Sequence, residues 1–262
     1  MSEPGGEGTV HLRIDAGVAH VVFDRPAARN AMTWAMYRSL MSICEELAAD
    51  RSVRVTCLRG AGGQAFIAGT DIAQFTGFAS GEDGLAYEAQ IDRGISALAS
   101  LPMPTLALIE GWAVGGGLAI ATACDFRIAT PASKLGVPIA KTLGNCLSMA
   151  NLARLRDAFG TQRVRRMLLL AEFIGAEEAL ACGYLHEVVE PHALDEAGAK
   201  LCATLASLAP LTQGVTKRAL ARLVPGTLPD GEDLVRECYA SEDFREGVQA
   251  FVARRAPQWK GR

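Results

Sequence analysis

Two glycine-containing turns are the segments of this sequence best suited to chemistry at a carbonyl group. One is Ala65–Ile72, in which Gly69 and Thr70 are adjacent, and the other is Gly111–Gly117, which ends in three consecutive glycines. Each follows a predicted strand and leads towards a helix, where backbone N–H groups and the helix dipole suit a developing oxyanion. Two such donors on one carbonyl would stabilise an enolate or a tetrahedral intermediate. Alternatively, the glycines only let a helix pack closely on a sheet, and the spacing leaves both interpretations open.

A further glycine-rich segment, Gly60–Ala65, has the spacing G-x-G-x-x-A of a dinucleotide-binding turn. In that motif a helix begins at the turn, so that its N-terminus receives the pyrophosphate. The residues that follow here, Phe66–Asp71, are typical of another loop. We therefore do not expect a nucleotide site at this position.

The elements that must position these turns are indicated by hydrophobic periodicity. Alternating apolar residues predict a hairpin of two strands, Val10–Ile14 and Val18–Phe23. Thr33 is a suitable N-cap for an amphipathic helix that extends from Met36 to Leu47. The other predicted strands are 53–60, Thr105–Ile109, Phe126–Ala129 and Leu185–Val189, and the other predicted helices contain Ile91–Leu98, Leu118–Ala123 and most of the chain beyond residue 150. A glycine-rich loop is predicted from Gly60 to about Gly84. From Pro191 onward only helices are predicted, so the order indicates an α/β core followed by a helical C-terminal segment.

Size and charge exclude several classes of protein. The chain has 262 residues, which is near the upper end of what one hydrophobic core supports. Its net charge of −3 argues against nucleic acid as a partner, because binding to phosphates needs clustered Lys and Arg. The sequence contains no apolar run of about 18 residues, so we expect no membrane-spanning helix.

The seven cysteines are dispersed and form no CxxC pair. Such a pattern is typical of reduced thiols in a cytosolic protein rather than of a disulfide framework or a zinc site. The first ten residues contain neither a basic patch nor an apolar stretch of the kind found in secretory signals. We therefore expect a cytoplasmic protein without a metal site.

Several segments together resemble the enoyl-CoA hydratase/isomerase (crotonase) superfamily. The resemblance spans residues 10 to 258, and the segments that carry it are Arg25–Met32, Arg59–Gly62, Ala65–Ile72, Pro104–Gly117, Cys124–Ala129 and Glu246–Pro257. It implies an α/β fold in which β-β-α units are wound as a spiral. It also implies an acyl-CoA-binding core over residues 1–195 and a helical trimerisation region over 196–262, in a homotrimer or a dimer of trimers. The substrate would be an acyl-CoA thioester, with coenzyme A as part of the substrate and no permanently bound cofactor.

Site residues can be carried over from the family by position. The resemblance implies that the backbone amides of Thr70 and Gly116 form an oxyanion hole. The family holds the nucleotide part of coenzyme A near its first hairpin, which here implies Arg25, Ala27 and Arg29, although both arginines could equally be surface charges. The remaining substrate-binding positions that it implies are Ala68 and Ile72 along the adenine and pantetheine path, and Gly115, Ala119, Pro138, Ile139 and Asn145.

The sequence departs from the family where hydratases carry two catalytic glutamates. Such a pair makes physical sense, because syn addition of water needs one proton removed and one delivered. The first glutamate should stand two residues after the glycine run, where this chain has Ala119. The second should follow Gly136-Val137-Pro138, where this chain has Ile139. Neither side chain exchanges protons, which weakens the case for ordinary two-glutamate hydration.

Another carboxylate could supply the missing proton transfer. Family members with other chemistries place working residues on the helix after the first oxyanion turn, where Asp92 lies with Glu88 one turn earlier on the same face. Asp92 is the leading candidate, and the alternative is a solvent-facing carboxylate. Asn145 lies where a related dehalogenase has a catalytic carboxylate; its amide could bind a substrate or cap a helix but could not act as a base. Tyr87 and Ser148 are possible polar contacts. Outside the expected pocket lie the histidines His11, His20, His186 and His192.

The sequence therefore predicts an acyl-CoA-processing enzyme of the enoyl-CoA hydratase/isomerase type. The oxyanion hole does not choose among hydration, isomerisation, decarboxylation and hydrolysis, because the superfamily uses it in all of them. One alternative is a protein that binds acyl-CoA without turnover. The other is a specialised enzyme whose substrate carries its own acid or base, or needs only enolate stabilisation.

Overall fold

The computed structural model describes residues 6–222 and 231–260, and this part of the chain contains two β-sheets. The strands of the larger sheet, in spatial order, are β1 (Thr9–Asp15), β2 (Val18–Asp24), β3 (Val55–Gly60), β5 (Thr105–Ile109), β7 (Phe126–Ala129) and β10 (Glu187–Val188). Those of the smaller sheet are β4 (Ala65–Ile67), β6 (Trp112–Val114), β8 (Lys134–Gly136) and β9 (Ile174–Gly175). The β1–β2 and β8–β9 pairs are antiparallel, and the other pairs are parallel.

The chain passes repeatedly from the larger sheet to the smaller one and then into a helix. The strand pairs β3–β4, β5–β6 and β7–β8 each do so, and they are followed by α2 (Gly81–Ala99), α3 (Gly116–Ala123) and α4 (Ile139–Thr142). Parallel neighbours in both sheets then come from successive β-β-α units. The predicted spiral of β-β-α units is therefore confirmed.

The first hairpin and the first helix match their predictions. In the hairpin, Val10 pairs with Phe23, and both side chains are buried. Helix α1 (Trp34–Ala49) begins after Thr33, whose side-chain oxygen accepts a hydrogen bond from the Met36 amide at 3.2 Å. The buried face of α1 packs on α2 and on β1 of the larger sheet.

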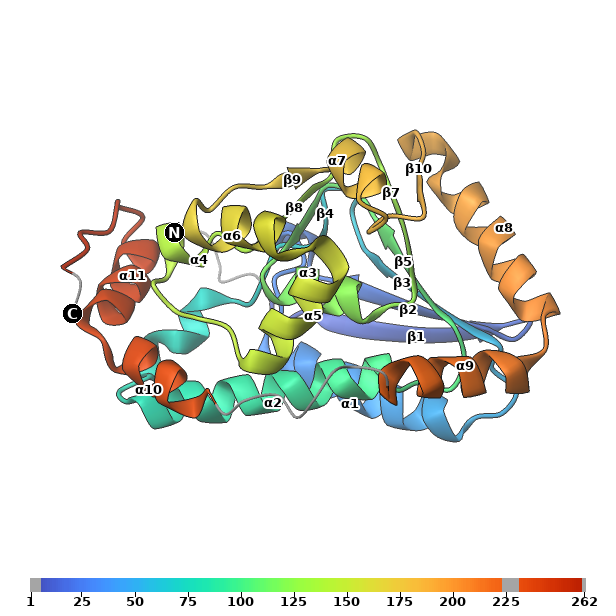
Figure 1. Ribbon diagram of the computed structural model, residues 1–262, viewed down its shortest axis with the longest axis horizontal. Helices are drawn as coiled ribbons and strands as arrows, with labels where there is room; N and C mark the ends of the chain where they lie inside the picture. Colours follow the sequence, from blue (N-terminus) through green and yellow to red (C-terminus); the bar gives the residue numbers. More distant parts are fainter. Residues whose placement is uncertain (1–5, 223–230, 261–262) are drawn as a thin grey trace.

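The remaining helices form the outer layers (Figure 1). They are α5 (Met149–Phe159), α6 (Thr161–Leu169), α7 (Ala176–Ala181), α8 (Leu194–Ser207), α9 (Pro210–Arg222), α10 (Glu232–Ala240) and α11 (Glu242–Val252), with short 3₁₀ helices at Pro26–Ala28, Ile72–Gly77 and Pro191–Ala193. Helix α8 packs on the larger sheet, whereas α10 and α11 lie at the opposite end of the molecule, where α10 packs on α2. The described part of the C-terminal segment is helical, as predicted; the predicted division at residue 195 and an oligomerisation role of this region stay predictions.

Part of the predicted glycine-rich loop is ordered structure. The segment contains β4 and a 3₁₀ helix, and α2 begins at Gly81, earlier than the apolar periodicity indicated. Ser80 and Asp83 form a capping box at this helix start. The first two turns of α2 also contain Gly84, whose ideal Cβ would lie 2.2 Å from the Tyr239 ring. The close contact between α2 and Tyr239 of the C-terminal helices therefore explains the glycines at the start of α2, which resemble a loop in the sequence.

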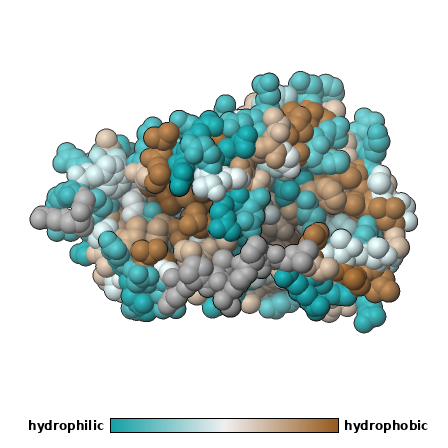
Figure 2. Space-filling view, in the orientation of Figure 1, coloured by the Kyte–Doolittle hydropathy of each residue, from teal (hydrophilic) through white to brown (hydrophobic). Residues whose placement is uncertain are grey.

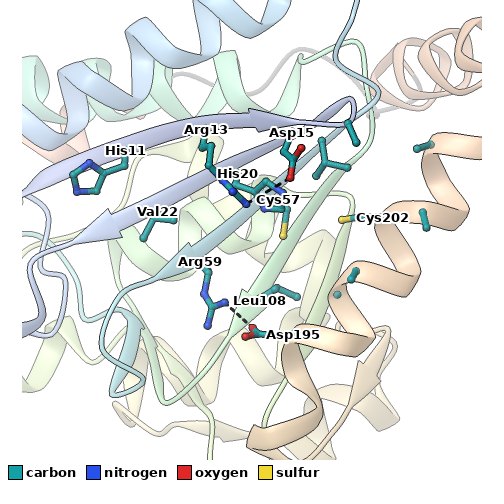
Figure 3. A pocket seen from close by; sticks show the side chains of 16 residues that line it. His11, Arg13, Asp15, His20, Val22, Cys57, Arg59, Leu108, Asp195 and Cys202 are labelled. Atoms are coloured by element: carbon teal, nitrogen blue, oxygen red, sulfur yellow. Dashed lines mark hydrogen bonds and ion pairs between the residues drawn. The ribbon is translucent and has the colours of Figure 1, made fainter.

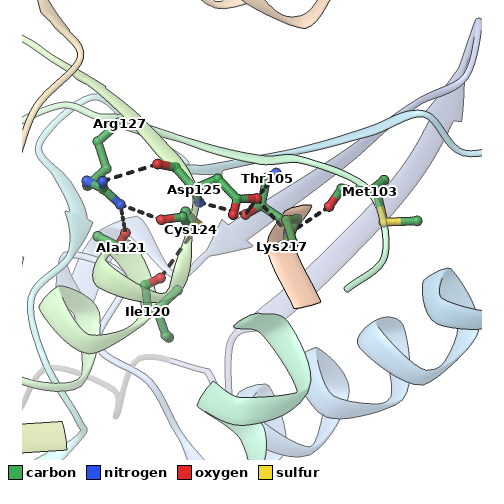
Figure 4. Close-up of polar contacts among 8 residues, drawn as sticks. All are labelled: Met103, Thr105, Ile120, Ala121, Cys124, Asp125, Arg127 and Lys217. Carbon is green, nitrogen blue, oxygen red and sulfur yellow. Dashed lines mark hydrogen bonds and ion pairs between the residues drawn. The ribbon is translucent and has the colours of Figure 1, made fainter. Parts of the chain in front are cut away.

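Polar contacts join helix α9 to the core (Figure 4). Lys217 donates hydrogen bonds from Nζ to Oδ2 of Asp125 at 2.6 Å and to the Met103 carbonyl at 2.9 Å. The same carboxylate accepts hydrogen bonds from the backbone and side chain of Thr105. Arg127 donates to the Cys124 and Ala121 carbonyls at the end of α3. The segment Cys124–Ala129, which carried part of the family resemblance, thus has a structural role.

Among the described residues, no helix combines the length and apolar character needed to cross a bilayer.

Candidate active site

A cavity of about 840 Å³ brings most of the predicted site residues together. Its walls come from the end of the first hairpin, both glycine turns, helices α2 and α4, the loop before α5, and α11. The predicted site residues that line it are Arg25, Ala27, Arg29, Ala68, Thr70, Ile72, Gly115, Gly116, Pro138, Ile139 and Asn145. Ala119 and Asp92 do not belong to this set of lining residues.

The two glycine turns converge in space. Gly69 has a φ of +111° and Gly115 a φ of +52°, backbone conformations that L side chains rarely adopt. An ideal Cβ on Gly115 would lie 3.9 Å from the Gly69 Cα atom, and one on Gly116 would lie 3.2 Å from Thr70 Oγ1. The second turn therefore brings the start of α3 directly against the first.

The hydrogen bonds around each turn indicate where its amide points. Beside Thr70, the Gly69 carbonyl accepts from Met32 N, and Asp71 N donates to the Met32 carbonyl, each at 2.8 Å. Successive amides of an extended segment point to opposite sides, so the Thr70 N–H is directed away from Met32. Gly116 is the first residue of α3, where N–H groups have no partner within the helix. Both amides therefore suit an acceptor in the cavity.

Three hydroxyl groups are connected next to these amides. Thr70 Oγ1 lies 2.8 Å from the Tyr37 hydroxyl and 3.1 Å from the Tyr87 hydroxyl. An ideal Cβ on Gly116 would lie 2.2 Å from the Tyr37 oxygen, so only a glycine fits there without a shift. Burial raises the pKa of both tyrosines above the ordinary value, and they stay neutral donors at physiological pH. The chain of hydroxyls fixes Thr70 in place.

Glu88 is a buried carboxyl group that lines the same cavity. Its side chain is 5% exposed. Its Oε1 accepts a hydrogen bond from the Tyr239 hydroxyl at 2.8 Å, and its Oε2 accepts one from Ser148 N at 3.0 Å. Burial raises the pKa of Glu88 from 4.5 to about 7, an effect that both hydrogen bonds oppose and the nearby charge of Asp92 reinforces. A proton can therefore join or leave this group near neutral pH.

Asp92 lies one turn further along α2 in a different environment. Its Oδ1 accepts a hydrogen bond from Ser148 Oγ at 2.9 Å and is 3.7 Å from a guanidinium nitrogen of Arg154. Its side chain is 25% exposed. The alternative of a fully solvent-facing carboxylate is wrong, because Asp92 is held in a half-buried ion pair. The structure favours Glu88 over Asp92 as the carboxyl group of the cavity, and a catalytic role of Asp92 stays a prediction.

Asn145, Ala119 and Ile139 have distinct places. Asn145 donates a hydrogen bond from Nδ2 to the Tyr239 hydroxyl at 3.2 Å, and Ser148, not Asn145, caps α5. The helix-cap alternative for Asn145 is therefore wrong. Ala119 lies half-buried within α3, and Ile139 is the first residue of α4 and faces the cavity. Neither position carries a group that could transfer a proton.

At the other end of the cavity, Arg25 is already engaged in structural contacts. Its guanidinium pairs with Asp71 at 2.8 Å and donates to the Ala31 carbonyl at 3.2 Å. Arg29 and Arg254 are exposed residues that line the same cavity. They are better placed than Arg25 to meet the phosphates of a nucleotide, because Arg25 is 12% exposed at its side chain.

A second cavity of about 680 Å³ lies between the larger sheet and α8 (Figure 3). His11 and His20 line it, together with Cys57 and Cys202, which face each other from the sheet and the helix. An ion pair of 2.6 Å between Arg59 and Asp195 connects its two walls. These histidines therefore lie away from the glycine turns, in agreement with the prediction.

Comparison with known proteins agrees with the fold. Residues 13–262 match the model of the family "Enoyl-CoA hydratase/isomerase". The chain is 34% identical to (E)-benzylidenesuccinyl-CoA hydratase of Thauera aromatica, over 96% of this chain and 99% of that protein. It is 29% identical to the short-chain-enoyl-CoA hydratase of Clostridium acetobutylicum, over 94% and 95% of the two chains. A methylmalonyl-CoA decarboxylase in complex with 2-nitronate-propionyl-CoA superimposes with a TM-score of 0.87 at 26% identity, over 97% of this chain and 98% of that one.

The protein belongs to the enoyl-CoA hydratase/isomerase family, the crotonase superfamily. Its relatives act on acyl-CoA thioesters, and they include decarboxylases as well as hydratases. The predicted family, fold class and general function are therefore confirmed.

Sequence reasoning did not identify all the residues of the site. The sequence alone does not single out Tyr37 or Tyr239, and it presents Glu88 only as a neighbour of Asp92 on one face of a helix. The helical periodicity of α2 could have identified Glu88, since it lies three residues before the buried Ile91 and seven before the buried Ile95. Tyr239 carried no such signal, because it reaches Glu88 from 151 residues away.

Proposed function

We propose that this protein is an enzyme that converts an acyl-CoA thioester through an enolate or oxyanion held by the backbone amides of Thr70 and Gly116. The observation that carries the proposal is the convergence of the two glycine turns at one wall of the cavity. Two amides in such a site stabilise charge that develops on the thioester oxygen, and each donor is worth about 10²–10³ in rate in comparable sites. The family membership supports a thioester as the source of that oxygen.

The proposed reaction type is proton transfer next to the thioester, as in isomerisation or hydration of an enoyl group. The relatives with hydratase names support this class, and the decarboxylase neighbour shows that the fold also serves decarboxylation. The family resemblance assigns the two hydratase glutamates to the positions of Ala119 and Ile139, so in this proposal proton transfer needs another group. Coenzyme A enters as part of the substrate, with Arg29 and Arg254 near its phosphates.

The test is turnover of three thioesters, crotonyl-CoA, 3-butenoyl-CoA and butyryl-CoA, in heavy water. Chromatography separates the isomers that differ in the position of the double bond, and mass spectrometry follows 3-hydroxybutyryl-CoA and deuterium at carbon. We expect at least one of these products with the wild-type protein. Binding of all three thioesters without any product or exchange would contradict the proposal and favour a binding protein without turnover.

We also propose a homotrimer or a dimer of trimers in the cytoplasm. Apolar side chains are exposed on α6 and α9, where Leu169 is 73% exposed and Leu211 is 76% exposed. Brown surface patches appear between teal ones on the face that Figure 2 shows. Association of copies would cover such side chains, since large exposed apolar groups favour interfaces. The free state of all seven cysteines supports a reducing compartment. Light scattering of the purified protein at several concentrations tests the assembly, and a monomer throughout would contradict it.

A further inference from the structure

We propose that Glu88 is the catalytic acid and base of this site, which removes a proton from the acyl carbon chain and returns it. The inference rests on the proposed function, because it assumes that the acyl thioester occupies the cavity with its carbonyl oxygen at Thr70 and Gly116. In this proposal, one carboxyl group from α2 performs the proton transfers for which the hydratases of the family use two glutamates. That group enters the cavity from a different element, since the hydratase positions lie on α3 and at the start of α4.

The first argument is the position of Glu88 relative to the two amides. Glu88 and both amide residues line the same cavity. The Tyr37 hydroxyl touches Thr70 Oγ1 at 2.8 Å and lies beside Gly116. The Glu88 charge acts on this same hydroxyl and contributes to the raised pKa of Tyr37. Tyr87, the residue before Glu88, also contacts Thr70 Oγ1 through its hydroxyl at 3.1 Å, so the carboxyl group and the oxyanion site share one cavity.

The second argument is how the carboxyl group is held. The Tyr239 hydroxyl and the Ser148 amide, both neutral, bind one oxygen each. Because each carboxyl oxygen has two lone-pair positions, each retains one that can take a proton. Tyr239 has a single hydrogen and gives it to Glu88, so the Asn145 amide must donate to Tyr239. Residues from α10 and from the loop before α5 thus orient Glu88.

The third argument is that both protonation states are accessible. A buried carboxyl group held by neutral donors loses its proton less readily than one that is paired with a cation, and the pKa of about 7 agrees with this. A catalytic acid and base works best with a pKa near the operating pH. The titratable groups that interact with Glu88 are Tyr37, Tyr87, Asp92, Cys146, Cys238 and Tyr239.

The chemical step is balanced without a further reactant. The ionised Glu88 oxygen takes a proton from carbon, and the C–H electron pair forms the enolate double bond. The carbonyl π pair moves to the thioester oxygen, where the Thr70 and Gly116 amides hold the charge. The enolate then collapses and takes the proton back from Glu88, either at the same carbon or at a carbon two positions away. In heavy water the carboxyl hydrogen of Glu88 exchanges with solvent before it returns, so the first return leaves deuterium at the original carbon. In a substrate with a double bond between C3 and C4, the second return moves that double bond into conjugation with the thioester.

Asp92 is less suited to this step. Its ion pair with Arg154 and its hydrogen bond from Ser148 Oγ stabilise the ionised form, although burial raises its pKa. It lies outside the residues that line the cavity. Asp92 therefore acts on Glu88 through its charge and through Ser148, as a positioning residue.

The test compares Glu88→Gln with Glu82→Gln, which makes the same change on an exposed residue at the start of α2. Glutamine fits the Glu88 site, because its carbonyl oxygen can accept from Ser148 N while its amide donates to Tyr239. Exchange and double-bond shift of 3-butenoyl-CoA are measured in heavy water, and binding of butyryl-CoA is measured by calorimetry. We expect Glu88→Gln to lower both rates at least a hundredfold with the Kd unchanged within threefold. Glu82→Gln should stay within twofold of the wild type.

Two further variants keep the outcome decisive. Glu88→Asp retains a carboxyl group but retracts it, and we expect an intermediate rate, at least tenfold below the wild type. Asp92→Asn should lower the rate less than Glu88→Gln does. Retention of more than a third of the wild-type rate in Glu88→Gln would overturn this inference while the proposed function stands. A wild-type protein without any product or exchange would instead overturn the proposed function, and this inference with it.

Discussion

The buried carboxyl group of Glu88 should make the stability of this protein depend on pH in a way that one substitution removes. The substitution is Glu88→Gln, which deletes the ionisable group and can keep the contacts with Tyr239 and Ser148. Burial raises the pKa of Glu88 from 4.5 to about 7. A group with a raised pKa in the folded state binds its proton more tightly there than in the unfolded chain. Stability must therefore fall as the pH rises through this interval.

The size of the effect follows from the two pKa values. Below about pH 4.5 Glu88 is protonated in both states, and its burial has no charge cost. Between pH 4.5 and about 7 the unfolded chain releases the proton while the folded protein keeps it. At about 1.4 kcal/mol per pH unit, the loss in the free energy of unfolding reaches about 3 kcal/mol above pH 7. Glu88→Gln lacks this loss. Because the other groups titrate alike in both proteins, the difference in the free energy of unfolding between variant and wild type reports the titration of Glu88.

The assay is urea denaturation of both proteins at pH 5, 6, 7 and 8, at one protein concentration. We expect the free energy of unfolding of Glu88→Gln, relative to wild type, to increase by about 2–3 kcal/mol from pH 5 to pH 8, because part of the total loss falls below pH 5. Glu82→Gln serves as the control, because Glu82 is exposed, and its difference from wild type should change little with pH. If the difference in the free energy of unfolding between Glu88→Gln and the wild type stays constant from pH 5 to pH 8, the reasoning that Glu88 is buried without a compensating charge is refuted.

Three further predictions test other parts of the site and the fold. Gly116→Ala places a Cβ 2.2 Å from the Tyr37 oxygen, so the turn that carries the Gly116 amide must shift. The kcat should therefore fall about a hundredfold, with the Kd for butyryl-CoA nearly unchanged. A variant as active as the wild type would contradict the arrangement of the turn. Tyr239→Phe removes a hydrogen bond that lowers the pKa of Glu88, so the pH at which deuterium exchange reaches half its maximum should move to a higher value; an unchanged profile would exclude this link. Lys217→Met leaves a partly buried carboxylate without its cation, and urea denaturation should show a loss of about 2 kcal/mol; a loss below about 0.5 kcal/mol would show that this contact is not needed.

Much of the fold was predictable because its signals are local. The hairpin has alternating apolar residues, and Thr33 carries a side chain that caps α1, so short stretches of sequence determine both. The short strands β4, β6 and β8 were missed. Each has only three residues, too few for a periodic pattern, and each is stabilised by neighbours from distant parts of the chain.

The site was predictable to the extent that backbone conformation requires particular residues. Gly69 and Gly115 adopt positive φ angles, which is why glycines mark the two turns in the sequence. The choice between Glu88 and Asp92 was not predictable in the same way. Both lie on one face of α2, and only the contacts from Tyr239 and Arg154 separate a cavity carboxyl group from an ion-paired one. Those contacts depend on how α10 packs on α2 and on where α5 places Arg154.

The central claim is that the Thr70 and Gly116 amides polarise the carbonyl of a bound acyl-CoA thioester. The most direct measurement is difference infrared spectroscopy of butyryl-CoA carrying ¹³C at the thioester carbonyl. We predict that the carbonyl stretch moves to lower frequency when the thioester passes from water to the wild-type protein, and that Gly116→Ala loses most of this shift. A bound carbonyl with the same frequency as in water, or the same shift in both proteins, would contradict the proposed oxyanion hole.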